Sequence, residues 1–143
     1  IKIGFVNTER ILRDSAPAKA AQTKLEQEFS KRDKELQDIA ARLKSLSERL
    51  DRDAPTLAES DRSRRQRELA DLDKDFQRRQ REFREDLNQR RNEELAQVID
   101  RANREIKRIA ETEKYDLIVQ EAVVTSARID ITDRVLRALN AGK

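Results

Sequence analysis

Residues 18–50 read AKAAQTKLEQEFSKRDKELQDIAARLKSLSERL. Their apolar positions are spaced alternately four and three apart, and polar residues interrupt the ladder only at Gln22 and Arg32. Such heptad spacing predicts a coiled-coil seam, which exposes one narrow apolar stripe and therefore needs a partner helix. The apolar members of the ladder are Ala18, Leu25, Phe29, Leu36, Ile39, Leu43, Leu46 and Leu50.

A turn signal near residues 54–58 divides the middle of the chain into two long helices. No Gly or Pro interrupts the helical pattern after Pro17, which suits a first helical turn, so we predict a helix up to Asp53, roughly 55 Å long. Thr56 followed three residues later by Glu59 is a capping-box pattern for a second helix. Because the turn is short, the two helices are expected to be antiparallel and to form a helical hairpin.

The second helix should extend to about Glu113, and its apolar spacing changes along its length. Heptad spacing relates Leu69, Leu72, Phe76 and Phe83, with Arg79 in the seam. Beyond them, an eleven-residue repeat relates Leu87, Leu95, Val98, Ala102, Ile106 and Ile109. Because eleven-residue spacing removes left-handed supercoiling, the change predicts a new packing partner for the end of this helix.

The two chain ends carry strand patterns. Residues 1–6 alternate as a strand, residues 115–119 resemble a buried strand that residues 123–125 extend or pair with, and residues 128–131 resemble a half-exposed strand. Asn7 or Thr8 should cap a short helix, and Thr132 should cap a last one. We therefore predict a mainly α fold, in which a hairpin arm (17–113, tip 54–58) extends from a small β-rich oligomerisation body (1–16 with 114–143).

Self-association is expected because three short strands cannot form a stable core alone. The apolar strand residues need cover, which the sheets of several combined protomers would provide. The alternative is a monomer in which the terminal helix covers the sheet. The predicted oligomer interface consists of Ile3, Phe5, Leu117, Ile118, Val119, Ile129 and Ile131.

Composition argues against an enzyme. The 143 residues include no His and no Cys, which removes the usual general base, thiol nucleophile and transition-metal ligands. Paired carboxylates such as Asp71 with Asp73, or Glu93 with Glu94, are interpreted as ordinary helix surface. We predict no catalytic residue, no metal site, no cofactor and, since no run of about 18 apolar residues occurs, no transmembrane helix.

Positive charge is concentrated in residues 62–91, where ten arginines and Lys74 stand against seven acidic residues. Most of these arginines are interpreted as a solvated sleeve with partners one turn away, such as Arg78 with Glu82. Arg79 differs because its seam position predicts a packed stem and a guanidinium directed at an anion or at a carboxylate across the hairpin. A basic surface can bind nucleic acid, but no interleaved aromatic residues or recognition motif support that function here.

Several segments together resemble the Skp (OmpH-like) family of periplasmic chaperones over essentially the whole chain. The segments are Ile3-Gly4-Phe5-Val6-Asn7, the hairpin, Arg90-Arg91-Asn92-Glu93-Glu94, Tyr115-Asp116-Leu117-Ile118-Val119 and Asp130-Ile131-Thr132-Asp133. The resemblance implies a periplasmic homotrimer whose helical arms enclose unfolded outer-membrane proteins without ATP. The chain opens directly in a strand without a leader, which is typical of a mature form after signal cleavage or of a shortened chain.

The resemblance also implies a site for lipopolysaccharide or an anionic membrane surface, formed in the family by one lysine and a pair of arginines. By alignment on Asn92-Glu93-Glu94, the lysine corresponds to Arg79 and the pair to Gln89 and Arg90, with Arg91 adjacent. The candidate residues are therefore Arg79, Arg90 and Arg91. Two other functions stay open from the sequence: a coiled-coil adaptor or spacer, and a basic protein that binds anionic lipid or nucleic acid.

Overall fold

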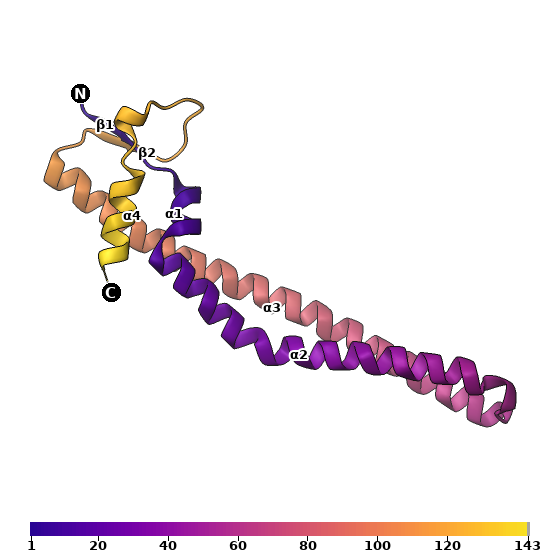
Figure 1. Cartoon of the computed structure of the whole chain (residues 1–143). Helices are drawn as coiled ribbons and strands as arrows, with labels where there is room; N and C mark the ends of the chain where they lie inside the picture. Colours follow the sequence, from indigo (N-terminus) through magenta and orange to yellow (C-terminus); the bar gives the residue numbers. More distant parts are fainter. Residues whose placement is uncertain (143) are drawn as a thin grey trace. The chain divides into compact units, whose positions relative to one another are not determined.

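The structure is a computed structural model that describes residues 1–142. The chain forms two compact units: residues 1–25 with the segment from Arg90 onward, and residues 26–89. The elements are β1 (Ile3–Phe5), α1 (Thr8–Asp14), α2 (Ala16–Asp53), the 3-10 turn η1 (Ala54–Thr56), α3 (Glu59–Glu113), β2 (Leu117–Val119), the 3-10 turn η2 (Ala127–Ile129) and α4 (Thr132–Ala141) (Figure 1). The fold is mainly α with a small sheet, as the sequence predicts.

The sheet of the first unit joins the two ends of the chain. β1 and β2 pair in parallel, with Ile3 opposite Leu117 and Phe5 opposite Val119. Gly4 lies between them along β1, and a Cβ there would be 3.1 Å from the Tyr115 ring. Glycine therefore allows the tyrosine to pack closely against the strand.

A hydrophobic core lies beside this sheet. It combines residues of α1, α3 and α4, because each of these helices is amphipathic and buries its apolar stripe. Tyr115 and Ile118 pack against it, half-buried. The core residues are Val6, Ile11, Ala102, Ile106, Ile109, Ile131, Val135, Leu136 and Leu139. The eleven-residue spacing of α3 thus matches the helix segment that packs on α1 and α4, which confirms the predicted change of partner.

The third predicted strand, over residues 128–131, is wrong. Residues 127–129 form a 3-10 turn, and only Asp130 makes an isolated bridge, to Phe5. The alternating pattern arises because Ile131 enters the core while Asp130 accepts a hydrogen bond from the Thr132 N–H at 2.9 Å. Residues 123–125 are likewise in a loop and not in a strand.

Of the three helix N-caps predicted from the sequence, the cap of α1 is confirmed and the caps of α3 and α4 are wrong. Asn7 caps α1, its Oδ1 accepting from the Arg10 N–H at 3.2 Å. Thr132 was expected to cap α4 but is its first residue, and its Oγ1 accepts from the Asn7 N–H at 2.9 Å. The predicted capping box of Thr56 is also wrong, because Thr56 belongs to η1 and α3 begins only at Glu59. At the start of α4, Asp130 accepts the hydrogen bond from the Thr132 N–H that a capping hydroxyl would otherwise accept.

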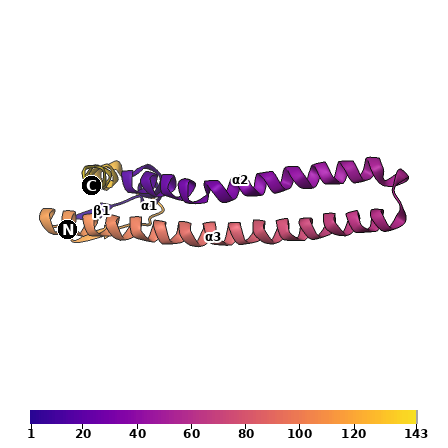
Figure 2. The same cartoon turned by 90° about the horizontal axis from the view of Figure 1, so that it is seen from below.

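In the second unit, α2 and α3 run antiparallel, and the turn at residues 54–58 connects them (Figure 2). The predicted seam is present, since Phe29 and Leu50 are buried and the seam residues between them are half-buried. The Phe29 and Phe83 rings meet edge to face, 5.6 Å apart. Arg32 lies over both rings and donates to Asp86 across the hairpin at 2.9 Å, so this polar seam residue still links the two helices.

The end of α3 has a left-handed residue. Lys114 follows the helix with φ of 59°, and the Tyr115 N–H donates to the Ala110 carbonyl at 3.0 Å. This is the Schellman arrangement, in which glycine is the usual residue at the left-handed position. The turn directs the chain from α3 into β2.

Candidate functional site

The outward face of the sheet is apolar. Ile3 and Leu117 pair directly and remain 40% and 52% exposed, and Ile1, Val123 and Val124 are almost fully exposed. β2 has β1 on one side, and no further strand pairs with it among residues 1–142. A two-stranded sheet with an open edge and an apolar face is a surface that favours association.

The seven residues predicted to form the oligomer interface do not share one environment. Ile3 and Leu117 are exposed, whereas Phe5, Ile118, Val119 and Ile129 are half-buried. Ile131 is only 3% exposed and belongs to the core of its own chain. The surface available to another molecule is therefore centred on the Ile3–Leu117 pair.

The seam position of Arg79 predicts that its guanidinium points at an anion or at a carboxylate across the hairpin. The structure shows no hydrogen bond or ion pair from Arg79 across the hairpin within residues 1–142. Its Nε donates instead to Asp75, one turn earlier in α3, at 2.8 Å. Arg78 shares Asp75 and also bonds Glu82 at 3.2 Å, as the sequence predicts for that pair. The hydrogen bonds from Arg78 and then Arg79 lower the pKa of the Asp75 carboxyl, so this cluster remains ionised at neutral pH.

Arg90 and Arg91 lie in the first unit, and their environments differ. The Arg90 guanidinium bonds Glu93 at 2.7 Å and Glu94 at 3.1 Å. Arg91 is exposed and has no hydrogen-bond or ion-pair partner among residues 1–142. Arg79 belongs to the second unit. Of the three predicted anion-binding residues, Arg91 thus has its whole guanidinium available to solvent.

Glu94 is the residue that the sequence interpretation missed. It was assigned to ordinary surface, yet it is 5% exposed and forms ion pairs with Lys24 of α2 at 2.9 Å and with Arg90. The hydrogen bond from Lys24 is the main cause that lowers the pKa of Glu94. A signal was present: Glu94 follows Leu87 by seven residues and precedes Val98 by four, so it stands on the buried stripe of α3.

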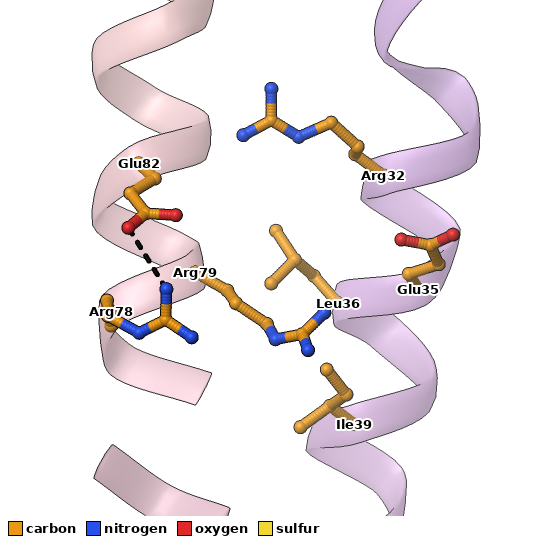
Figure 3. Close-up of a pocket in the computed structure, with 7 residues that line it drawn as sticks. All are labelled: Arg32, Glu35, Leu36, Ile39, Arg78, Arg79 and Glu82. Atoms are coloured by element: carbon orange, nitrogen blue, oxygen red, sulfur yellow. Dashed lines mark hydrogen bonds and ion pairs between the residues drawn. The ribbon is translucent and has the colours of Figure 1, made fainter. Parts of the chain in front are cut away.

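A groove of about 250 Å³ lies between α2 and α3 in the second unit (Figure 3). Leu36 and Ile39 form its apolar part, and Arg79 extends toward them from the opposite helix (Figure 3). The lining residues of the groove are Arg32, Glu35, Leu36, Ile39, Arg78, Arg79 and Glu82.

Residues 1–142 contain no cluster of three acidic, His or Cys side chains arranged to hold a metal ion. None of the helices in the same range is both long and apolar enough to cross a membrane.

Together, the helical hairpin and the small sheet made from both chain ends, with its exposed apolar pair, define a coiled-coil protein with a small sheet at the chain ends. The chain belongs to the family of outer membrane proteins described as OmpH-like, whose family model matches residues 2–139. This is a chaperone family and not an enzyme family.

Two related proteins align with most of the chain. The chaperone protein Skp of Pectobacterium atrosepticum is 30% identical over 139 residues, which are 95% of this chain and 84% of that protein. Skp of Photorhabdus luminescens is 30% identical over 123 residues, 86% of this chain and 74% of that protein. Among solved structures, an OmpH-like outer membrane chaperone from Caulobacter crescentus has the same fold, with a TM-score of 0.82 and 20% identity over 98% of this chain and 84% of that one.

Proposed function

We propose that this chain is a periplasmic holdase that keeps unfolded outer-membrane proteins from aggregating and works without ATP. The observation that carries the proposal is the family match over nearly the whole chain, with relatives named chaperone protein Skp. The chain has two glycines, Gly4 and Gly142, too far apart for a phosphate-binding loop. A holdase binds many different clients, so many weak contacts on a large charged surface suit it better than one deep pocket.

The working form in this proposal is a homotrimer. The exposed Ile3–Leu117 pair and the open edge of β2 support association through the sheet, because burying them removes apolar surface from water. The half-buried Phe5, Ile118, Val119 and Ile129 would complete the interface behind this pair. Three hairpins would then project from one shared body and enclose the client.

The test combines mass and activity. Light scattering should give three times the mass of one chain, and the protein should suppress aggregation of several unrelated β-barrel proteins diluted from urea, with no nucleotide added. A coiled-coil adaptor would instead bind a single partner in fixed ratio and leave most of these clients to aggregate. Equal aggregation with and without the protein would overturn the holdase function.

We further propose that Arg79, Arg90 and Arg91 contact lipopolysaccharide or an anionic membrane surface. Arg91 supports this proposal best, because its guanidinium has no ion-pair partner within residues 1–142 and can bind a phosphate without breaking one. Replacing all three by Glu should abolish binding to lipopolysaccharide at low salt while helix content and oligomeric mass stay unchanged. Unaltered affinity would assign these arginines to the solvated surface.

A further inference from the structure

The groove of Figure 3 exists because the seam of the hairpin is incomplete there. Arg79 occupies the seam position of α3 opposite Leu36 and Ile39, which are half-buried. Nearer the start of α2, where Phe29 meets Phe83, the seam is closed by ring contact. An apolar side chain at position 79 would pack on these residues, so the arginine leaves an apolar surface of α2 uncovered.

The polar groups beside this apolar surface are of two kinds. Among residues 1–142, the Arg79 guanidinium donates one hydrogen bond, from Nε to Asp75, so its terminal amino groups remain available as donors. Glu35, adjacent to Leu36, has no hydrogen-bond or ion-pair partner in the same range and is available as an acceptor. The groove thus offers an apolar contact with a free donor and a free acceptor.

Charge balance indicates what the groove accepts. Arg32 is neutralised by Asp86, and Arg78 by Asp75 and Glu82. Arg79 is paired with Asp75, so within residues 1–142 Glu35 is the lining charge without a partner, and a phosphate or another concentrated anion inside the groove would meet its carboxylate. A peptide group is neutral and presents one N–H and one C=O, which match the free acceptor and the free donor.

We propose that this groove binds one apolar residue of an extended, unfolded polypeptide. The apolar side chain contacts Leu36 and Ile39, a neighbouring peptide C=O accepts from Arg79, and a peptide N–H donates to Glu35. The volume of about 250 Å³ is below that of sites for drug-sized ligands and suits a single side chain. The inference deepens the holdase proposal and rests on it: main-chain recognition with one apolar contact is independent of client sequence.

The test measures the affinity of the full-length protein for a fluorescently labelled, urea-diluted β-barrel protein. Arg79→Leu should weaken binding about tenfold, because it removes a charged hydrogen-bond donor and fills the groove. Arg81→Leu is the matched control, since Arg81 is exposed, unpartnered in residues 1–142 and outside the groove, and should change affinity less than twofold. Glu35→Gln keeps an acceptor and should bind nearly as wild type, whereas Glu35→Ala should weaken binding.

Two further measurements separate the possible outcomes. Thermal unfolding should show that Arg79→Leu is at least as stable as wild type, because leucine completes the seam, so weaker binding does not reflect unfolding. The second measurement is the binding of the same variants to vesicles that contain anionic lipid, which separates a loss of client binding from a loss of lipid binding. Equal loss of client binding in Arg79→Leu and Arg81→Leu, or loss of vesicle binding alone, would overturn the inference. A wild-type protein that protects clients while Arg79→Leu protects them equally removes the inference and leaves the holdase function; a wild-type protein that protects none removes both.

Discussion

Glu94 illustrates how a buried charge is retained on a helix that is otherwise apolar on that side. Lys24 from α2 and Arg90 from the preceding turn of α3 both bond its Oε1, so the carboxylate is compensated from two helices. Burying this carboxylate without a partner would be costly, and removing Lys24 or Arg90 would leave it buried with only one of its two ion pairs. The ion pairs therefore link the start of α2 to α3 within the first unit.

The lowered pKa of Glu94 gives the first prediction. A carboxyl whose pKa is lower in the folded than in the unfolded state stabilises the fold above its ordinary pKa of 4.5, and this contribution is lost as the pH falls through the folded-state value. Glu94→Gln should therefore lower the thermal midpoint at pH 7, and the difference from wild type should shrink below about pH 4. Glu111→Gln, on the exposed side of α3, is the control and should change neither. A pH-independent difference would contradict the role of the charge.

Lys114 gives the second prediction, in which a substitution stabilises the protein. Its φ of 59° is unfavourable for a residue with a Cβ, and its side chain is exposed. Lys114→Gly should raise the free energy of unfolding by roughly 0.5–1 kcal/mol, measured by urea denaturation. The same change at Lys107, exposed inside α3, should lower it by about 1 kcal/mol. Destabilisation by Lys114→Gly would mean that the lysine makes a contact worth more than the strain.

At the scale of elements, the long helices were predictable and the short ones less so. The ends of the helices at Asp53 and Glu113 follow from a Pro-containing turn and from the end of the apolar repeat, both of which are local signals. Residues 128–131 alternate like a strand, but Ile131 packs in the core and Asp130 accepts a hydrogen bond from the first residue of α4. These tertiary contacts do not alter the local hydrophobic pattern of a four-residue segment, so the pattern alone cannot distinguish a turn from a strand.

The candidate sites were predictable to a similar extent. Heptad counting placed Arg79 in the seam, yet its partner depends on side-chain geometry, because Asp75 one turn away is reached more easily than any carboxylate on α2. The apolar character of Ile3 and Leu117 was evident, but which strand residues face outward depends on the parallel register of two segments far apart in the sequence. The roles of these residues in oligomerisation and lipid binding remain predictions.

The exposed pair on the sheet supports the third prediction. Leu117→Asp places a charge in the proposed interface without disturbing the core of the chain, because Leu117 is half exposed and outside that core. Light scattering should show dissociation of the oligomer, since an unpaired charge buried between copies costs several kcal/mol. Gln120→Asp, one residue beyond β2 and exposed, should leave the mass unchanged. An intact Leu117→Asp oligomer would place the interface elsewhere.

At the scale of the whole molecule, the proposed function depends on the length of the hairpin. Replacing about residues 40–69 by the native turn, residues 53–58, removes matching parts of α2 and α3 and leaves the first unit unchanged. Oligomeric mass should be preserved, whereas protection of a large unfolded client should fall much more than protection of a small one, because the enclosed volume is reduced. Equal protection of both clients by the shortened protein would favour the adaptor function.

The pairing of β1 with β2 also determines the order in which the molecule can fold. Lys2 and Asp116, which bond at the edge of the sheet, are 114 residues apart along the chain, whereas the Asp53–Arg65 ion pair near the turn closes a loop of 12. Loop-closure entropy favours the short connection, so the hairpin should zip from its turn toward the ends. β1 is thus among the last elements to find its partner, and during synthesis it must wait for more than a hundred later residues before its sheet can form.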